Sequence, residues 1–213
     1  MLPYYKIITV PDLAQITQEL DQAVSELITR QFDIKAVYNF NVIDTSRLLE
    51  LSPALTAWLT AVGLKNNLLF AALGCCMPAI ETQLHDDGLC TEAINFPVYN
   101  CEKGYSVWCR SGLDTHQDYV KRWEAIESEK NTIASIDRYS REIRSSTMYR
   151  HRTRQRLHLT DIMTADNPEL ARVSNQYPVW VNTNIPHYGI NLSDKMRIIL
   201  TMRFNCPINI DAL

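Results

Sequence analysis

The chain has 213 residues, a formal net charge of −3 at pH 7, 46% hydrophobic residues and 21% charged residues. This composition is ordinary for a globular protein, and the length fits one domain with a sizeable core. No stretch approaches the eighteen or so apolar residues of a membrane span, and the N-terminus lacks a signal-peptide apolar run. Six cysteines include no CxxC pair, which disfavours a zinc site. We therefore expect a cytoplasmic protein with reduced thiols and no membrane partner.

The N-terminal third predicts helices between short strands. A strand is expected near residues 4–10 and another over residues 36–44. Apolar residues that recur every three to four positions predict a helix between them: Leu13, Ile16, Leu20, Val24 and Leu27. A second helix should start with Ser52 as N-cap and Pro53 at the first helical position, and should end near Gly63.

From residue 68 onward the chain predicts strands, which are short, apolar or alternating, and separated by Pro, Gly, Asp or Asn. They cover residues 68–75, 79–85, 92–100, 105–110, 178–183 and 196–204. Helices followed by a run of strands favour a β-barrel or sandwich with helices on one side. We predict one domain over residues 1–213, with a helical support region at 1–67 and a barrel at 68–205. The polar residues 111–146 are interpreted as an insertion.

One segment carries a metal-binding pattern. If the strand over 79–85 continues, its two-residue period places His85 and Asp87 on the same face. Together they supply two ligands of the two-His-one-carboxylate triad, which leaves open positions on non-haem iron. The alternative is an ordinary surface turn over residues 85–88, because aspartate favours turns.

A second segment near the C-terminus strengthens the metal-site interpretation. His187 opens a short predicted strand, and Arg197 follows ten residues later on the last strand. Alternation puts Arg197 on one face together with Ile199, Thr201 and Arg203. An arginine on the inner face of a barrel needs an anion, since an unpaired buried charge costs several kcal/mol. Its guanidinium is well suited to a carboxylate.

The order His-x-Asp, His and then Arg resembles the 2-oxoglutarate/Fe(II)-dependent oxygenase superfamily, including small aspartyl/asparaginyl-hydroxylase-like and phage-type members. The resemblance covers roughly residues 68–205. It implies a mainly β fold: a double-stranded β-helix (jelly-roll or cupin-like) barrel, with the N-terminal helices packed on its outer sheet. It also implies that His85, Asp87 and His187 bind Fe(II), and that Arg197 binds the cosubstrate 2-oxoglutarate. Molecular oxygen would be the other cosubstrate.

Asn95 is a further candidate for the cosubstrate or substrate site. In the predicted strand 92–100 it shares a face with Tyr99, and either side chain could contact 2-oxoglutarate or orient a substrate. The alternative is that Asn95 satisfies a backbone group inside the barrel.

An arginine-rich segment between residues 138 and 158 contains seven arginines and one acid, Glu142. Arg150, Arg152, Arg154 and Arg156 occupy every second position, so a strand would carry them on one face. One interpretation is a site for nucleic acid or another anion; the favoured one is a charged strand edge that discourages aggregation. The predicted activity is oxidation of a protein or amino-acid side chain. A nucleic-acid-directed oxygenase, a cupin-like metal-binding protein without 2-oxoglutarate chemistry, and a non-catalytic interaction module remain as alternatives.

Overall fold

The computed structural model describes residues 3–27, 38–81, 91–109 and 169–213 of the chain. The N-terminal part contains short strands and helices: β1 (Tyr5–Ile7), α1 (Leu13–Leu27), β2 (Tyr38–Ile43), α2 (Thr45–Leu51), α3 (Pro53–Ala61) and the 3₁₀ turn η1 (Lys65–Asn67). After η1, the elements of the described residues are strands, with one 3₁₀ turn at the end: β3 (Leu68–Cys76), β4 (Ile80–Glu81), β5 (Glu92–Tyr99), β6 (Gly104–Cys109), β7 (Glu169–Ser174), β8 (Val179–Asn182), β9 (His187–Asn191), β10 (Arg197–Phe204) and η2 (Ile210–Ala212). In the described part of the chain, no helix is long and apolar enough to cross a membrane.

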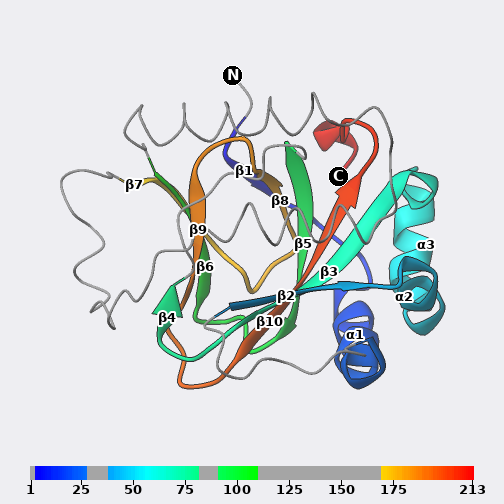
Figure 1. The fold of residues 1–213 in the computed structure, drawn as a ribbon. Helices are drawn as coiled ribbons and strands as arrows, with labels where there is room; N and C mark the ends of the chain where they lie inside the picture. Colours follow the sequence, from blue (N-terminus) through cyan, green and yellow to red (C-terminus); the bar gives the residue numbers. More distant parts are fainter. Residues whose placement is uncertain (1–2, 28–37, 82–90, 110–168) are drawn as a thin grey trace, which may run out of the picture.

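The strands form two antiparallel sheets. One has the order β1-β8-β5-β10-β3-β2 and the other β4-β9-β6-β7. The eight strands β3 to β10 give two facing sets, β8-β5-β10-β3 and β4-β9-β6-β7, and β1 and β2 extend the first set at its edges (Figure 1). Strands of the two sets alternate along most of the chain, as in a jelly roll. The predicted double-stranded β-helix is therefore confirmed by the strand order.

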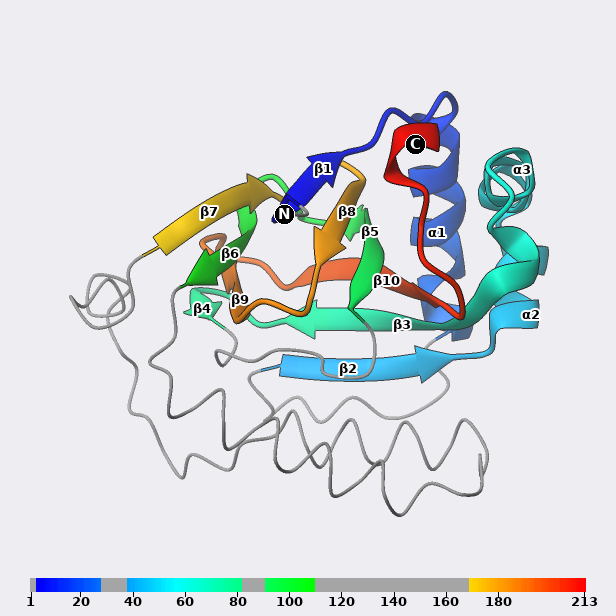
Figure 2. The same ribbon diagram turned by 90° about the horizontal axis from the view of Figure 1, so that it is seen from above.

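The N-terminal helices cover the outer face of the six-stranded sheet. Alternation on β10 directs Ile198, Leu200 and Met202 into the main hydrophobic core, where residues of α1 and α3 such as Leu20 and Leu59 join them. In Figure 2 the three helices group on the side of the sheet away from β4, β9, β6 and β7. Each fully buried leucine or isoleucine stabilises this packing by about 2 kcal/mol. The opposite face of β10 consequently points into the barrel.

The helices begin largely where the sequence predicts, with one addition. The apolar stripe of α1 is confirmed, because Ile16, Leu20 and Leu27 are buried. Ser52 and Pro53 start α3 as expected, although the Ser52 hydroxyl donates to Glu19 Oε2 at 2.9 Å and does not cap the helix.

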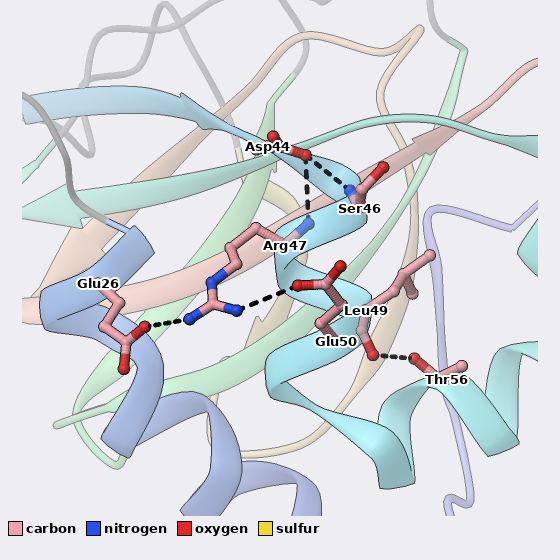
Figure 3. Close-up of polar contacts among 7 residues, drawn as sticks. All are labelled: Glu26, Asp44, Ser46, Arg47, Leu49, Glu50 and Thr56. Atoms are coloured by element: carbon pink, nitrogen blue, oxygen red, sulfur yellow. Dashed lines mark hydrogen bonds and ion pairs between the residues drawn. The ribbon is translucent and has the colours of Figure 1, made fainter.

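The added helix is α2, which the sequence interpretation missed. The carboxylate of Asp44 accepts from the backbone N–H groups of Ser46 (2.8 Å) and Arg47 (3.2 Å), an N-cap arrangement (Figure 3). The Arg47 side chain contacts Glu26 of α1 at 2.6 Å and Glu50 of α2 at 3.1 Å. These ion pairs are exposed and contribute little, so the cap and the packing of Leu48 hold α2 in place.

Candidate functional site

His187 is the first residue of β9 and lies on the inner face of the barrel. It pairs with Trp108 of β6, which packs between the two sheets with Ala93 and Val181. The Nδ1 atom of His187 lies 2.9 Å from the carbonyl oxygen of Ile185. A carbonyl can only accept, so Nδ1 carries the proton and Nε2 is the basic nitrogen. This contact fixes the tautomer and ring orientation that a metal-ligating imidazole needs.

Arg197 opens β10 and points into the barrel, opposite to its neighbour Ile198. Only 1% of the residue is exposed. Its Nη1 donates to the carbonyl oxygen of Ile190 at 3.2 Å, while its buried Nε has no hydrogen-bond partner. Among the described residues no carboxylate forms an ion pair with it. The barrel therefore holds a buried cation for which this part of the chain supplies no counter-anion.

The polar groups nearest to Arg197 include thiols, and these are neutral at physiological pH. Burial raises the pKa of Cys75 to about 12. Burial also raises the pKa values of Cys76 and Cys101, against the opposing effect of the positive charge on Arg197. Desolvation disfavours the thiolate more strongly than the arginine favours it. The cysteines therefore leave the charge of Arg197 uncompensated.

Small side chains line the strands between His187 and Arg197. His187 and Asn191 stand four residues apart on β9, about 13 Å along the strand, and Asn191 pairs with Gly104, which touches Arg197. The inward pair between these levels is Ser106 and Gly189. On the facing sheet, the inward residues include Ala72 and Thr201, which pair with each other. On the four-stranded sheet, small side chains therefore lie between His187 and Arg197, whereas the facing β10 also carries the buried Ile199 on the same face as Arg197.

Asn95 lies on the inner face as well, paired with Thr201 of β10. Its side-chain Oδ1 is buried and has no hydrogen-bond partner in the described residues. The expectation that Tyr99 shares this face is wrong. The register between β5 and β10 shifts after Pro97, so Tyr99 pairs with the outward-facing Ile198 and is 46% exposed. An irregularity of this kind reverses the side-chain alternation.

The other two predicted metal ligands, His85 and Asp87, lie outside the described residues. The strand that precedes them, β4, pairs with β9 through Ile80–Asn191 and Glu81–Ile190. At Glu81, the last described residue before them, the chain runs antiparallel to β9, toward the end of β9 that begins with His187. No group of three His, Cys, Asp or Glu residues that could hold a metal occurs within the described ranges. The triad remains a prediction, as do the insertion at 111–146 and the Arg150–Arg156 row, which also fall outside these ranges.

Two residues beside the site were not predicted to take part. Trp108 is fully buried in the core, and its ring lies beside that of His187. Gly104 received no role from the sequence, yet its Cα faces the Arg197 side chain. The second inward arginine of β10, Arg203, is also buried and donates to Thr183 Oγ1 at 2.7 Å and to the carbonyl oxygen of Glu92 at 3.2 Å.

Comparison with known proteins gives similarity at the level of structure alone. No protein-family model and no curated protein sequence matches the chain. Among solved structures, the non-haem α-ketoglutarate-dependent carbocyclase SnoK from nogalamycin biosynthesis is 17% identical, with a TM-score of 0.49 over 94% of this chain and 79% of that one. HygX from Streptomyces hygroscopicus, with nickel and 2-oxoglutarate bound, is 13% identical, with a TM-score of 0.45 over 94% and 82%.

A cupin, the oxalate decarboxylase of Lactobacillus farciminis, is 11% identical, with a TM-score of 0.37 over 87% of this chain and 33% of that one. This chain therefore spans about a third of that protein. Similarity as distant as this assigns no chemistry to the chain. The fold assignment rests on the strand order described above.

Proposed function

We propose that the chain is an Fe(II)- and 2-oxoglutarate-dependent oxygenase that hydroxylates, or otherwise oxidises, a protein or amino-acid side chain. The observation that carries the proposal is the buried guanidinium of Arg197 on the inner barrel face, with Nε unpartnered and no ion-pairing carboxylate among the described residues. A buried cation of this kind costs several kcal/mol unless an anion joins it. A dicarboxylate cosubstrate would be that anion.

The proposed roles follow the inner face of the barrel. His85, Asp87 and His187 would hold the metal, and Arg197 would bind the distal carboxylate of 2-oxoglutarate. Asn95 would donate to the cosubstrate or orient the substrate. When bound, iron and 2-oxoglutarate supply the oxidising power by coupling the reduction of dioxygen to oxidative decarboxylation. The protein's share is to place these groups and to exclude water.

The residues present fit such a cosubstrate at both of its ends. The His187–Ile185 contact presents Nε2 as the basic nitrogen, and Arg197 supplies charge with a free donor. Between them, Ser106 and Gly189 on one sheet and Ala72 on the other are small.

The test is an anaerobic titration of the purified protein with Fe(II) and then with 2-oxoglutarate, followed by visible absorption. Chelation of iron by the oxo-acid gives a weak charge-transfer band, so the substrate need not be known. His187→Ala should abolish the band. Arg197→Met should require at least tenfold more 2-oxoglutarate, because a charge-assisted contact contributes about 1.5–3 kcal/mol.

The matched control is Arg172→Met. Arg172 pairs with Val107 on the outer face of the four-stranded sheet and binds Glu169 at 2.7 Å. This variant removes an arginine from the same barrel without touching its interior, so its titration should match the wild type. Absence of the band in metal-replete wild-type protein refutes the oxygenase assignment. Metal binding without the band identifies a cupin-like metalloprotein, and absence of metal binding a non-catalytic module.

A further inference from the structure

We infer that Gly104 is a positioning residue for Arg197, and through it for the carboxylate of the cosubstrate. The inference rests on the proposed function and extends it to a residue with no polar side chain. It starts from the space beside Gly104. A Cβ atom built on Gly104 would lie 2.5 Å from Arg197 Cδ and 3.1 Å from Arg197 Nη1. A contact of 2.5 Å is far inside the separation at which carbon atoms attract each other, so any side chain at 104 displaces the arginine.

Backbone conformation does not explain this glycine. Among the described glycines, only Gly63 adopts a left-handed φ, of +73°. Gly104 opens a strand with conventional pairing to Asn191. A larger residue could adopt the backbone angles of position 104. What position 104 requires is the absence of a side chain, because Arg197 occupies that volume.

The backbone of Gly104 cannot yield in place of the arginine. Its N–H donates to the carbonyl oxygen of Cys101 at 3.0 Å, and its own carbonyl oxygen accepts from the N–H of Asn175 at 2.9 Å. The preceding carbonyl, of Lys103, accepts from Leu192 at 2.9 Å. Two other segments, at Asn175 and Leu192, are therefore bonded to the turn that brings β6 next to Arg197. Displacing this turn would break these hydrogen bonds, and the two that join Gly104 to the buried Cys101 and Asn175 are costly to leave unmade.

Displacement therefore falls on the Arg197 side chain, which has little freedom of its own. The residue is 1% exposed and its Nη1 is bound to the carbonyl oxygen of Ile190. A shift at Cδ moves Nε, which is bonded to it, together with the plane of the guanidinium. Recognition of a carboxylate through two parallel N–H groups depends on that plane. Loss of one such charge-assisted contact lowers affinity about tenfold or more.

The experiment compares Gly104→Ala with the wild type in two anaerobic titrations: Fe(II) alone, read by protein fluorescence, and 2-oxoglutarate on the Fe(II)-loaded protein, read by visible absorption. We expect unchanged affinity for Fe(II) and a dissociation constant for 2-oxoglutarate at least tenfold higher. Gly63→Ala is the control, because Gly63 has a left-handed φ and a Cβ added to it would meet no atom within 4 Å. It should lower thermal stability and leave both affinities unchanged.

Wild-type affinity for 2-oxoglutarate in a folded Gly104→Ala protein would overturn the inference and leave the proposed function standing. Failure of the wild type itself to bind 2-oxoglutarate would overturn both. A double-mutant cycle on stability adds a reading that does not depend on the ligand. In the Arg197→Ala background the clash is gone, so Gly104→Ala should lower the urea midpoint far less than in the wild-type background. If Gly104→Ala lowered the urea midpoint equally in both backgrounds, glycine at position 104 would be required by the turn and not by the Arg197 side chain.

Discussion

The indole of Trp108 and the imidazole of His187 lie with ring centroids 6.3 Å apart, at paired positions of β6 and β9. Trp108 is fully buried, and its Nε1 donates to the carbonyl oxygen of Asn182 at 2.8 Å. Tyr5 stacks on the same indole at 5.7 Å. The indole is therefore held rigidly beside a predicted metal ligand, which makes it a natural reporter of metal binding.

In a Trp123→Phe background, which removes the tryptophan outside the described residues, Trp108→Phe should remove most of the fluorescence quenching that Co(II) produces. The two tryptophans that remain, Trp58 and Trp180, are packed on the far side of the six-stranded sheet. The variant should also lose about 2–4 kcal/mol of stability, since it creates a cavity and leaves the Asn182 carbonyl unpaired. A fluorescence titration and a urea unfolding curve measure the two effects. Quenching of wild-type size in folded Trp108→Phe would place the metal away from His187.

Asn95→Leu should leave the stability within about 1 kcal/mol of the wild type, because the Oδ1 that it removes is buried and unpartnered within the described residues. The dissociation constant of 2-oxoglutarate, or of the substrate once known, should rise several-fold. Asn41→Leu is the matched control. The Nδ2 atom of Asn41 is likewise buried without a hydrogen-bond partner among the described residues. Asn41 differs in its position, because it pairs with Leu73, whose side chain faces the helices. Equal binding by both variants would reduce Asn95 to a structural residue.

The buried thiol of Cys75 should make stability fall at alkaline pH. Its pKa rises from an ordinary value of 9.0 to about 12 on folding, so its contribution is complete below pH 9 and is lost as the pH climbs through 12. Between pH 9 and 12, each rise of one pH unit lowers the free energy of unfolding by about 1.4 kcal/mol through this one thiol. Cys75→Ala and Cys75→Ser should therefore flatten urea-derived stability between pH 9 and 12. If stability fell with pH as steeply in both variants as in the wild type, the alkaline loss would not come from Cys75.

The sequence was informative wherever a strand has two different faces. On β10 the alternation correctly separated Arg197, Ile199, Thr201 and Arg203 from the residues that meet the helices. The same rule failed for Tyr99, because the register shift after Pro97 is a property of the pairing with β10 and not of the strand itself. It also missed β7, whose residues Glu169–Ser174 are mostly half-exposed and lack an apolar alternation.

The candidate site was predictable only in part for a similar reason. His187 and Arg197 could be selected because imidazole and guanidinium have few other uses on the inner face of a barrel. The contact between Gly104 and Arg197 could not be predicted, because it joins residues far apart in the chain and leaves no trace in either local pattern. Hydrogen bonds such as that between His187 Nδ1 and Ile185 likewise depend on where the strand begins.

Helix α2 illustrates a local signal that was present and overlooked. Asp44 is followed by Thr45, Ser46 and Arg47, and its carboxylate accepts two backbone N–H groups at 2.8 and 3.2 Å (Figure 3). Asp44→Ala should destabilise the protein by about 1 kcal/mol, because those donors lose their partner and a charge favourable to the helix N-terminus disappears.

Asp44→Asn retains an accepting oxygen and should recover most of that loss, whereas Arg47→Ala removes only exposed ion pairs and should change stability by less than about 0.5 kcal/mol. Urea unfolding of the three variants measures the differences. Because α2 packs through Leu48 against the outer core and not against the inner barrel face, 2-oxoglutarate binding should be the same in all three. A larger loss for Arg47→Ala than for Asp44→Ala would show that the ion pairs, and not the cap, hold the helix.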